Sequence, residues 1–193
     1  FILFDKTDIG LNKIPMRIID TNLKEVILDE SFFNIDRISV KDLLIDDGYI
    51  YLAYTREQKE DCYNTAILRS KVSEVYLKFE DFFVYDDCVP TSYQEWNAHQ
   101  TGGTMFSSKG KGEIFFSIGE FRDRIRAQDK NSIFGKIVKI NVIDQNYEII
   151  SMGHRNVQGL YYNAEKEKLI MSEHGPRGGD EININHKVGN EIE

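Results

Sequence analysis

Long apolar runs are missing from this sequence, and so are cysteines at close spacing. No stretch of about eighteen apolar residues exists, so no segment can cross a bilayer as a helix. Cys62 and Cys88 stand alone rather than in a C-x-x-C pair, which argues against a zinc or redox motif. They are either two buried thiols or a disulfide, and a disulfide would imply an oxidising compartment.

Acidic residues outnumber basic ones, and no targeting signal is visible. The 24 basic residues face 32 acidic ones, for a net charge of -8. Such a field repels polyanions, so we expect no nucleic-acid partner. The chain begins at Phe1, and no basic stretch precedes an apolar segment, so no signal peptide is seen. We interpret this start as a processing site or a truncation.

Helical periodicity is scarce, whereas short alternating or β-branched runs are common. The chain has only 3 prolines, and aromatic residues make up 12% of it. This pattern favours strands over helices. The predicted strands cover residues 16–20, 25–28, 49–54, 65–69, 76–79, 113–118, 137–141, 147–152, 159–162 and 169–173.

A loose internal repeat joins these strands in pairs. An apolar strand, a polar turn and a second strand recur at 42–54, 103–118 and 159–173. Four short antiparallel strands recurring every 40–50 residues or so are typical of propeller blades, and inserted loops would explain the wider spacing here. A β-sandwich is the alternative. We expect a long connection at 81–100, and a solvated loop or an exposed helical turn at 121–132.

Three clusters of residues offer chemistry. The first is Asn97-Ala98-His99-Gln100-Thr101-Gly102-Gly103, in which a histidine precedes two glycines that open a strand. Glycines let a ligand approach the backbone closely, and a histidine titrates near neutral pH, so His99 is a candidate general base. A plain surface histidine is the alternative.

The second cluster is Gly153-His154-Arg155-Asn156-Val157-Gln158-Gly159, which places three donor side chains on one turn. Because an arginine fork suits carboxylates, this turn is either a polar connection between blades or a site for an anionic, oxygen-rich ligand.

The third cluster runs Glu173-His174-Gly175-Pro176-Arg177-Gly178-Gly179-Asp180-Glu181. Its glycines and proline predict an irregular loop with free carbonyls, and two carboxylates follow. Calcium prefers such oxygen ligands. The alternative is a glycine-rich turn with two solvated acids.

Taken together, the second and third clusters resemble the soluble glucose/sorbosone dehydrogenase family. Ser117-Ile118-Gly119-Glu120, Arg126-Ala127-Gln128-Asp129 and Gly135-Lys136 agree with it as well, and the match runs over about 97–185. The resemblance implies an all-β fold, a six-bladed β-propeller of the quinoprotein dehydrogenase type. It also implies two cofactors, pyrroloquinoline quinone (PQQ) and Ca²⁺. The 193 residues would form a single domain, a partial propeller of about three to four blades.

The resemblance also implies roles for individual residues. His99 would take the proton of the substrate hydroxyl, and Glu120 would orient His99. Arg155 and Asn156 would contact the quinone, with Gln158 nearby.

The calcium site would lie in the third cluster. Gly175 and Pro176 would offer backbone carbonyls to calcium, while Asp180 and Glu181 would hold the loop or a second calcium. Val157 departs from the family pattern, where proline is usual, and the glycine- and leucine-rich segment of the family is not recognisable around 33–46.

The implied activity is oxidation of an aldose or related polyol, with a sugar substrate, an electron acceptor and a possible homodimer. We expect a periplasmic or secreted protein. Because members of the resembled family are secreted, the resemblance also favours a disulfide between Cys62 and Cys88. We also expect a fragment that is inactive alone. In the resembled family, basic residues further along the chain bind the cofactor, and they are not found in this sequence, which ends at Glu193. The alternatives are a non-catalytic calcium-binding propeller and a propeller hydrolase or lactonase.

Overall fold

Three antiparallel sheets form the body of the molecule. The computed structural model describes residues 4–7, 10–13, 18–27, 40–90, 99–108 and 110–185. The first sheet has the order β4 (Val40–Asp46), β5 (Tyr49–Lys59), β6 (Cys62–Lys71) and β8 (Glu80–Phe83), with β9 (Val89–Pro90) paired to the start of β6. The second runs β10 (Gly102–Ser108), β11 (Glu113–Ile118), β12 (Lys136–Asn141) and β13 (Tyr147–Met152). The third runs β14 (Val157–Asn163), β15 (Lys168–Glu173) and β16 (Glu181–Asn185).

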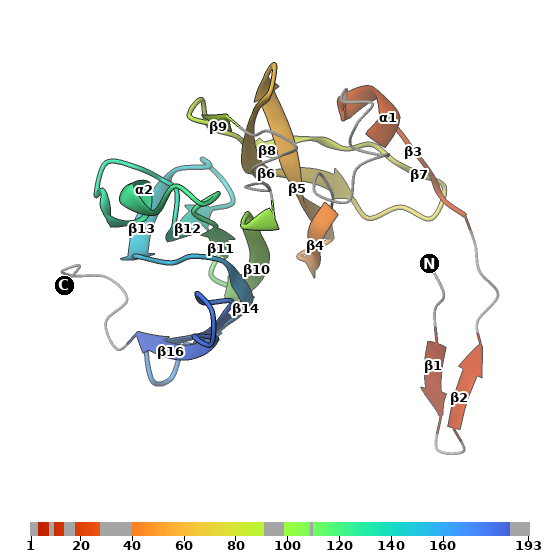
Figure 1. The fold of residues 1–193 in the computed structure, drawn as a ribbon. Coiled ribbons are helices and arrows are strands. Elements are labelled where there is room, and N and C mark those ends of the chain that lie inside the picture. The colour runs from red at the N-terminus through yellow and green to blue at the C-terminus, as the bar shows by residue number, and fades with distance from the viewer. Residues whose placement is uncertain are drawn as a thin grey trace.

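The first strand of each sheet lies innermost. β10 contacts both β4 and β14, so the three sheets succeed one another around one side of an axis (Figure 1). Strands that follow in sequence lie next to one another within each sheet, apart from short β7, which the first sheet skips. This meander, repeated around an axis, is the blade architecture of a β-propeller. The predicted partial propeller is confirmed.

Both faces of the middle blade are buried, which explains why its strands carry apolar residues on both faces. Phe116 belongs to the core cluster shared with the first blade, whereas its neighbour Phe115 packs in the cluster shared with the third. Successive side chains of a strand point to opposite faces, so a blade between two others needs apolar residues at both. In β11 the consecutive residues Ile114, Phe115 and Phe116 are therefore all apolar and buried.

The remaining elements are short. β1 (Phe4–Thr7) pairs with β2 (Gly10–Lys13), and β3 (Asp20–Thr21) pairs in parallel with β7 (Tyr76–Leu77). The helices are α1 (Leu23–Val26) and α2 (Arg124–Gln128). Within the described ranges no helix is long and apolar enough to cross a membrane.

Most predicted strands are confirmed, but the one at 25–28 is wrong. Residues 23–26 form α1 instead, because Asn22 fixes the chain there. Its side chain donates to the Phe79 carbonyl (2.9 Å) and accepts from the Phe79 N–H (2.7 Å). Ile27 then packs in the core of the first blade, so tertiary contacts override the β-propensity of this segment. The strand predicted at 16–20 is also largely wrong, because Ile18 and Ile19 are in no strand and only Asp20 belongs to one, β3. Residues 16, 17 and 28 lie outside the described residues.

The connection predicted at 81–100 is partly wrong. β8 supplies the outer strand of the first blade, with Phe82 and Phe83 buried. Cys88 lies just before β9 and is bonded to Cys62 at the start of β6, which confirms the disulfide. Residues 91–98 lie outside the described residues.

The segment predicted as an exposed loop or turn at 121–132 is anchored more firmly than expected. It contains α2, and Lys136 holds the end of this helix. The Lys136 ammonium is fully buried and donates to the carbonyls of Arg126 (2.9 Å), Ala127 (2.8 Å) and Phe134 (2.8 Å). Burial lowers the pKa of Lys136 to about 8.

Candidate functional site

The three predicted clusters meet at the ends of the innermost strands. Asn156 joins them: its Oδ1 accepts from the Gly102 N–H (3.0 Å) and its Nδ2 lies 3.4 Å from the His99 carbonyl oxygen. The His174 N–H donates to the Asn156 carbonyl (3.1 Å). A buried asparagine therefore ties the turn before β14 to the segment before β10 and to the loop after β15. Asn97 and Ala98 lie outside the described residues.

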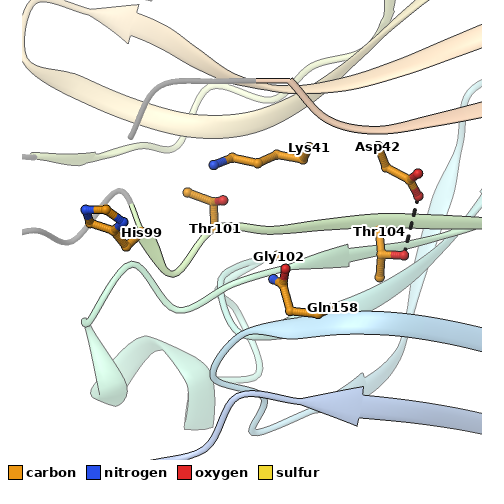
Figure 2. Close-up of a pocket in the computed structure, with 7 residues that line it drawn as sticks. All are labelled: Lys41, Asp42, His99, Thr101, Gly102, Thr104 and Gln158. Carbon is orange, nitrogen blue, oxygen red and sulfur yellow. Dashed lines mark hydrogen bonds between the residues drawn. The ribbon is translucent and has the colours of Figure 1, made fainter. Parts of the chain in front are cut away.

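One hollow, which we call the His99 hollow, opens between the innermost strands of the three blades. Its lining residues are Lys41, Asp42, His99, Thr101, Gly102, Thr104 and Gln158. His99 is exposed. Figure 2 shows the Lys41 side chain running along the hollow toward His99, while Asp42 turns to Thr104.

Asp42 fastens β4 to β10. Its Oδ2 accepts from the Met105 N–H (2.7 Å) and lies 3.4 Å from the Thr104 hydroxyl, and its Oδ1 accepts from the Leu43 N–H (2.8 Å). Its carboxylate is thus satisfied by the protein and sets how closely the first two blades approach at the hollow.

A second hollow, the Arg155 hollow, lies beside α2 and the loop after β15. Its lining residues are Glu120, Arg124, Ala127, Gln128, Met152, Gly153, His154, Arg155, Glu173, Gly175, Pro176, Glu181 and Asn183. Arg155 crosses it and donates through Nη1 to the carbonyls of His174 (3.0 Å) and Gly175. The guanidinium therefore faces the carbonyl that we predicted to bind calcium.

The predicted partner of His99, Glu120, lies in the Arg155 hollow. Its Oε1 is 3.6 Å from Arg155 Nε, an ion-pair distance. The Gln100 amide bridges the same two residues, donating to Glu120 Oε1 (3.1 Å) and accepting from Arg155 Nη2 (2.7 Å). Glu120 is thus linked to the neighbour of His99. Burial raises the pKa of Glu120, against the opposing charges of Arg155 and Arg124.

Glu173 organises the turn that carries Arg155. Its Oε2 lies 3.0 Å from His154 Nδ1, and its Oε1 accepts the Arg155 N–H. His154 is fixed in turn by Ser151, whose Oγ is 2.7 Å from Nε2. Burial alone would raise the pKa of Glu173, but hydrogen bonds from His154 and from the N–H groups of Arg155 and Asn156 hold it below its ordinary value.

The loop between β15 and β16 brings the four predicted metal residues together. A side chain at Gly175 would lie 1.7 Å from the Gly179 carbonyl, so only glycine permits this fold of the loop. The Pro176 carbonyl accepts from the Gly179 N–H (2.7 Å), and Asp180 Oδ1 accepts from the Gly175 N–H (3.2 Å). Glu181 is exposed at the start of β16.

The residues present fit an anionic cofactor beside a cation. Arg155 Nε is buried and, within the described part of the chain, has no hydrogen-bond partner, although it lies 3.6 Å from Glu120 Oε1; the positive charge of Arg155 suits an anionic ligand. Each carbonyl oxygen has two lone pairs, so Gly175 and Pro176 can accept from the protein and still face a calcium ion. No cluster of three or more acidic, histidine or cysteine side chains that could hold a metal occurs among the described residues.

Sequence reasoning missed several residues of the site. Lys41 and Asp42 come from β4, in a stretch where no motif was recognised. Gln100 and Glu173 were named only as members of their clusters. The signal for Glu173 was its position directly before a glycine-rich loop, at the end of a buried strand.

These features define the class of protein. Three blades of three to five strands around one axis, with polar loops meeting at the ends of the innermost strands, form part of a propeller of the six-bladed quinoprotein dehydrogenase type. The family model described as Glucose / Sorbosone dehydrogenase matches residues 37–190. The chain therefore belongs to the glucose/sorbosone dehydrogenase family.

Similar proteins are longer than this chain. Aldose sugar dehydrogenase YliI of Escherichia coli (strain K12) is 33% identical over 157 residues, which are 73% of this chain and 40% of that protein. Quinoprotein glucose dehydrogenase B of Acinetobacter calcoaceticus is 32% identical over 80 residues, 36% of this chain and 16% of that protein. This chain spans less than half the length of either relative.

Solved structures agree with the fold. The soluble aldose sugar dehydrogenase of Escherichia coli in its apo-form superposes with a TM-score of 0.65 at 27% identity, covering 78% of this chain and 48% of that one. A PQQ-bound aldose sugar dehydrogenase of Streptomyces coelicolor gives a TM-score of 0.53 at 24% identity, covering 76% and 43%. At that identity the second likeness concerns the fold alone.

Proposed function

We propose that this chain carries one side of the active site of a PQQ- and calcium-dependent dehydrogenase that oxidises an aldose or a related polyol. The complete protein, meaning this chain within a full six-bladed propeller, would perform the reaction, and the 193 residues alone would not. The observation that carries the proposal is the meeting of the His99, Arg155 and Gly175 segments around Asn156. The names of the similar quinoprotein and PQQ-bound enzymes support it.

In this proposal the two hollows have different tasks. The quinone, when bound, would accept a hydride from the sugar carbon, and calcium would polarise it. His99 would take the proton of the sugar hydroxyl, leaving a carbonyl product, because an imidazole acts as a base near its own pKa. Arg155 and Asn156 would hold the cofactor, with Gln158, which lines the His99 hollow, nearby.

The third cluster would hold the cation. The carbonyls of Gly175 and Pro176 would be its ligands, and Asp180 would brace the loop through the Gly175 N–H. Glu181 would supply a carboxylate beside the loop or to a second calcium. Glu120 would act through Gln100, which adjoins His99 in sequence, and through its ion pair with Arg155.

The cellular setting is also a proposal. The Cys62–Cys88 disulfide supports an oxidising compartment, and hence a periplasmic or secreted protein. A further electron acceptor would reoxidise the reduced cofactor after each turnover. A homodimer stays a prediction.

The test is reconstitution of the complete protein. We expect that adding PQQ with calcium gives a bound-quinone absorbance spectrum, and that aldoses then bleach the oxidised form. Chelation of calcium before addition of the quinone should prevent both changes. A protein that binds calcium but neither takes up the quinone nor responds to any sugar would instead be the alternative, a non-catalytic calcium-binding propeller.

A further inference from the structure

The motif Arg126-Ala127-Gln128-Asp129 lies on α2 and at its end, and it has no role in the chemistry proposed above. Ala127 and Gln128 line the Arg155 hollow, so α2 forms part of its wall. The Arg126 side chain turns instead to the first blade, where it contacts Asp87 in the connection between β8 and β9. This arginine therefore joins the wall of one hollow to a neighbouring blade.

Three groups fix the guanidinium of Arg126. Its Nη1 donates to both carboxylate oxygens of Asp87 (2.8 and 2.9 Å), and its Nε lies 3.0 Å from Asp123 Oδ2. The centre of the buried Phe134 ring is 5.3 Å from the guanidinium carbon, a distance at which the ring attracts a cation. The half-buried side chain is thus held in one orientation.

Asp87 is a rigid partner for this arginine. Its main-chain carbonyl accepts from the buried side chain of Asn64 (2.9 Å), which also donates to the Tyr85 carbonyl (2.9 Å). The next residue, Cys88, is bonded to Cys62 at the start of β6. An exposed ion pair usually contributes little because ordering two mobile side chains costs entropy. Here the carboxylate is short and its main chain is fixed, so less freedom is lost.

α2 lies directly against the turn that carries Arg155. The Gly153 N–H donates to the Ala127 carbonyl (3.0 Å), which also accepts from the buried Lys136 ammonium (2.8 Å). A side chain at Gly153 would come within 3.1 Å of Gln128 Nε2, so the helix end and the turn are in close contact. A displacement of α2 would therefore disturb the Arg155 turn as well.

We propose that Arg126 is a positioning residue, whose contact with Asp87 holds α2 and the Arg155 turn in the arrangement that binds the quinone. This inference rests on the proposed function and adds to it a coupling between two blades. The first blade then influences cofactor affinity, although the residues that line the Arg155 hollow all come from the later part of the chain, from Glu120 to Asn183.

The experiment measures the Kd for PQQ, with calcium present, in the complete protein and in Arg126→Met. Methionine keeps an apolar stem on Phe134 and removes the charged contact with Asp87. We expect Kd to rise about two- to thirtyfold, the range for residues that act on a site without touching its ligand. Arg126→Lys should retain part of the affinity. At saturating PQQ, kcat and the KM for the sugar should stay near the wild-type values.

Arg56→Met is the matched control. Arg56 Nη1 lies 2.8 Å from Asp81 Oδ1 on the first blade, and this pair is exposed to a similar extent as the Arg126–Asp87 pair. Its loss should leave the Kd for PQQ unchanged. Asp87→Ala should raise Kd as Arg126→Met does, and the double variant should be no weaker than either single one, because both changes remove the same contact. Thermal unfolding of each variant shows that it is folded.

Hydrogen–deuterium exchange in the absence of quinone tests the positioning role separately. The peptide that contains Gly153 should exchange faster in Arg126→Met than in the wild type or in Arg56→Met, because α2 no longer holds the Ala127 carbonyl in place. Mass spectrometry follows this exchange.

Four results would overturn the inference while leaving the proposed function intact. They are an unchanged Kd in Arg126→Met, an equal rise in Arg56→Met, additive effects of the Arg126 and Asp87 changes, and a raised Kd with unchanged exchange at Gly153. In the last case Arg126 would act on the quinone directly. If the wild-type protein takes up no quinone, the proposed function fails, and exchange at Gly153 decides: faster exchange in Arg126→Met supports the positioning role, and equal exchange contradicts it.

Discussion

The Arg155 hollow and the His99 hollow are built in different ways. Most of the Arg155 hollow comes from one stretch of chain, from Met152 to Asn183, and Glu173 and His154 bond to each other within it. The His99 hollow draws on three separate blades, through β4, the segment before β10, and β14. The first is held by local hydrogen bonds, whereas the second depends on how the blades pack. Damage to one should therefore differ in kind from damage to the other.

The largest expected effect concerns His99. In the complete protein, His99→Ala should lower turnover by about 10²–10⁴-fold, the usual contribution of a general base. Binding of PQQ and calcium should persist, because the residues that we propose bind them, Arg155, Gly175 and Pro176, line the Arg155 hollow instead. Steady-state kinetics and a quinone titration measure the two quantities. Wild-type turnover at every pH would contradict the role of His99.

Removal of Glu173 should damage the Arg155 hollow itself. Glu173→Ala leaves His154 and the Arg155 N–H without their buried acceptor. We expect a loss of about 2–4 kcal/mol in the free energy of unfolding, since buried unpaired donors each cost about 1–3 kcal/mol. Urea denaturation measures it, with exposed Glu165→Ala as the control. An unchanged unfolding midpoint would show that the turn does not depend on this carboxylate.

The Arg155→Ala variant should distinguish binding of PQQ from turnover of the sugar. Arg155→Ala removes the residue that we propose pairs with the quinone carboxylates, so PQQ affinity should fall about ten- to hundredfold. The apparent turnover at saturating PQQ should fall much less than in His99→Ala. A quinone titration followed by kinetics at saturation tests this. A loss confined to turnover, with unchanged PQQ affinity, would place Arg155 on the substrate side of the site.

The Asp42→Asn variant tests whether the shape of the His99 hollow depends on the packing of the first blade against the second. Asp42→Asn replaces one carboxylate oxygen by a donor, so either the Met105 or the Leu43 N–H loses its acceptor. We expect a loss of about 1 kcal/mol in the free energy of unfolding, together with a higher KM for the sugar. Asp86→Asn, at an exposed position, is the matched control. A stability loss with an unchanged KM would mean that β4 does not shape the sugar site.

More of the residues that line the Arg155 hollow than of those that line the His99 hollow could be named from the sequence, and the structure explains why. Arg155, Gly175 and Glu181 lie close together in sequence, so a motif records their neighbourhood. Lys41 and His99 are brought together only by the packing of β4 on β10, a long-range contact that no local pattern encodes. The strand predicted at 25–28 was wrong for the same reason. The contact between Asn22 and Phe79, which positions α1, joins residues that are distant in sequence.

The smallest expected effect is a response of the Arg155 hollow to acid. The pKa of Glu173 is lowered from its ordinary value of 4.5, although burial opposes the hydrogen bonds that lower it. A carboxyl with a lowered pKa binds its proton more weakly in the folded state than in the unfolded chain. Its contribution to stability is therefore present above the unfolded pKa and is lost as the pH falls through the folded pKa.

Other ionisable groups lie around the hollow, so the measurement is a difference between two proteins. His154 contacts Glu173 directly, and the pKa of neighbouring Glu120 is raised rather than lowered. Glu173→Gln keeps the size of the side chain and cannot ionise. We expect the stability advantage of the wild-type chain over Glu173→Gln to shrink steadily below pH 5 in urea denaturation. An advantage that is constant from pH 5 to pH 3 would show that the ionised carboxylate does not hold the Arg155 turn.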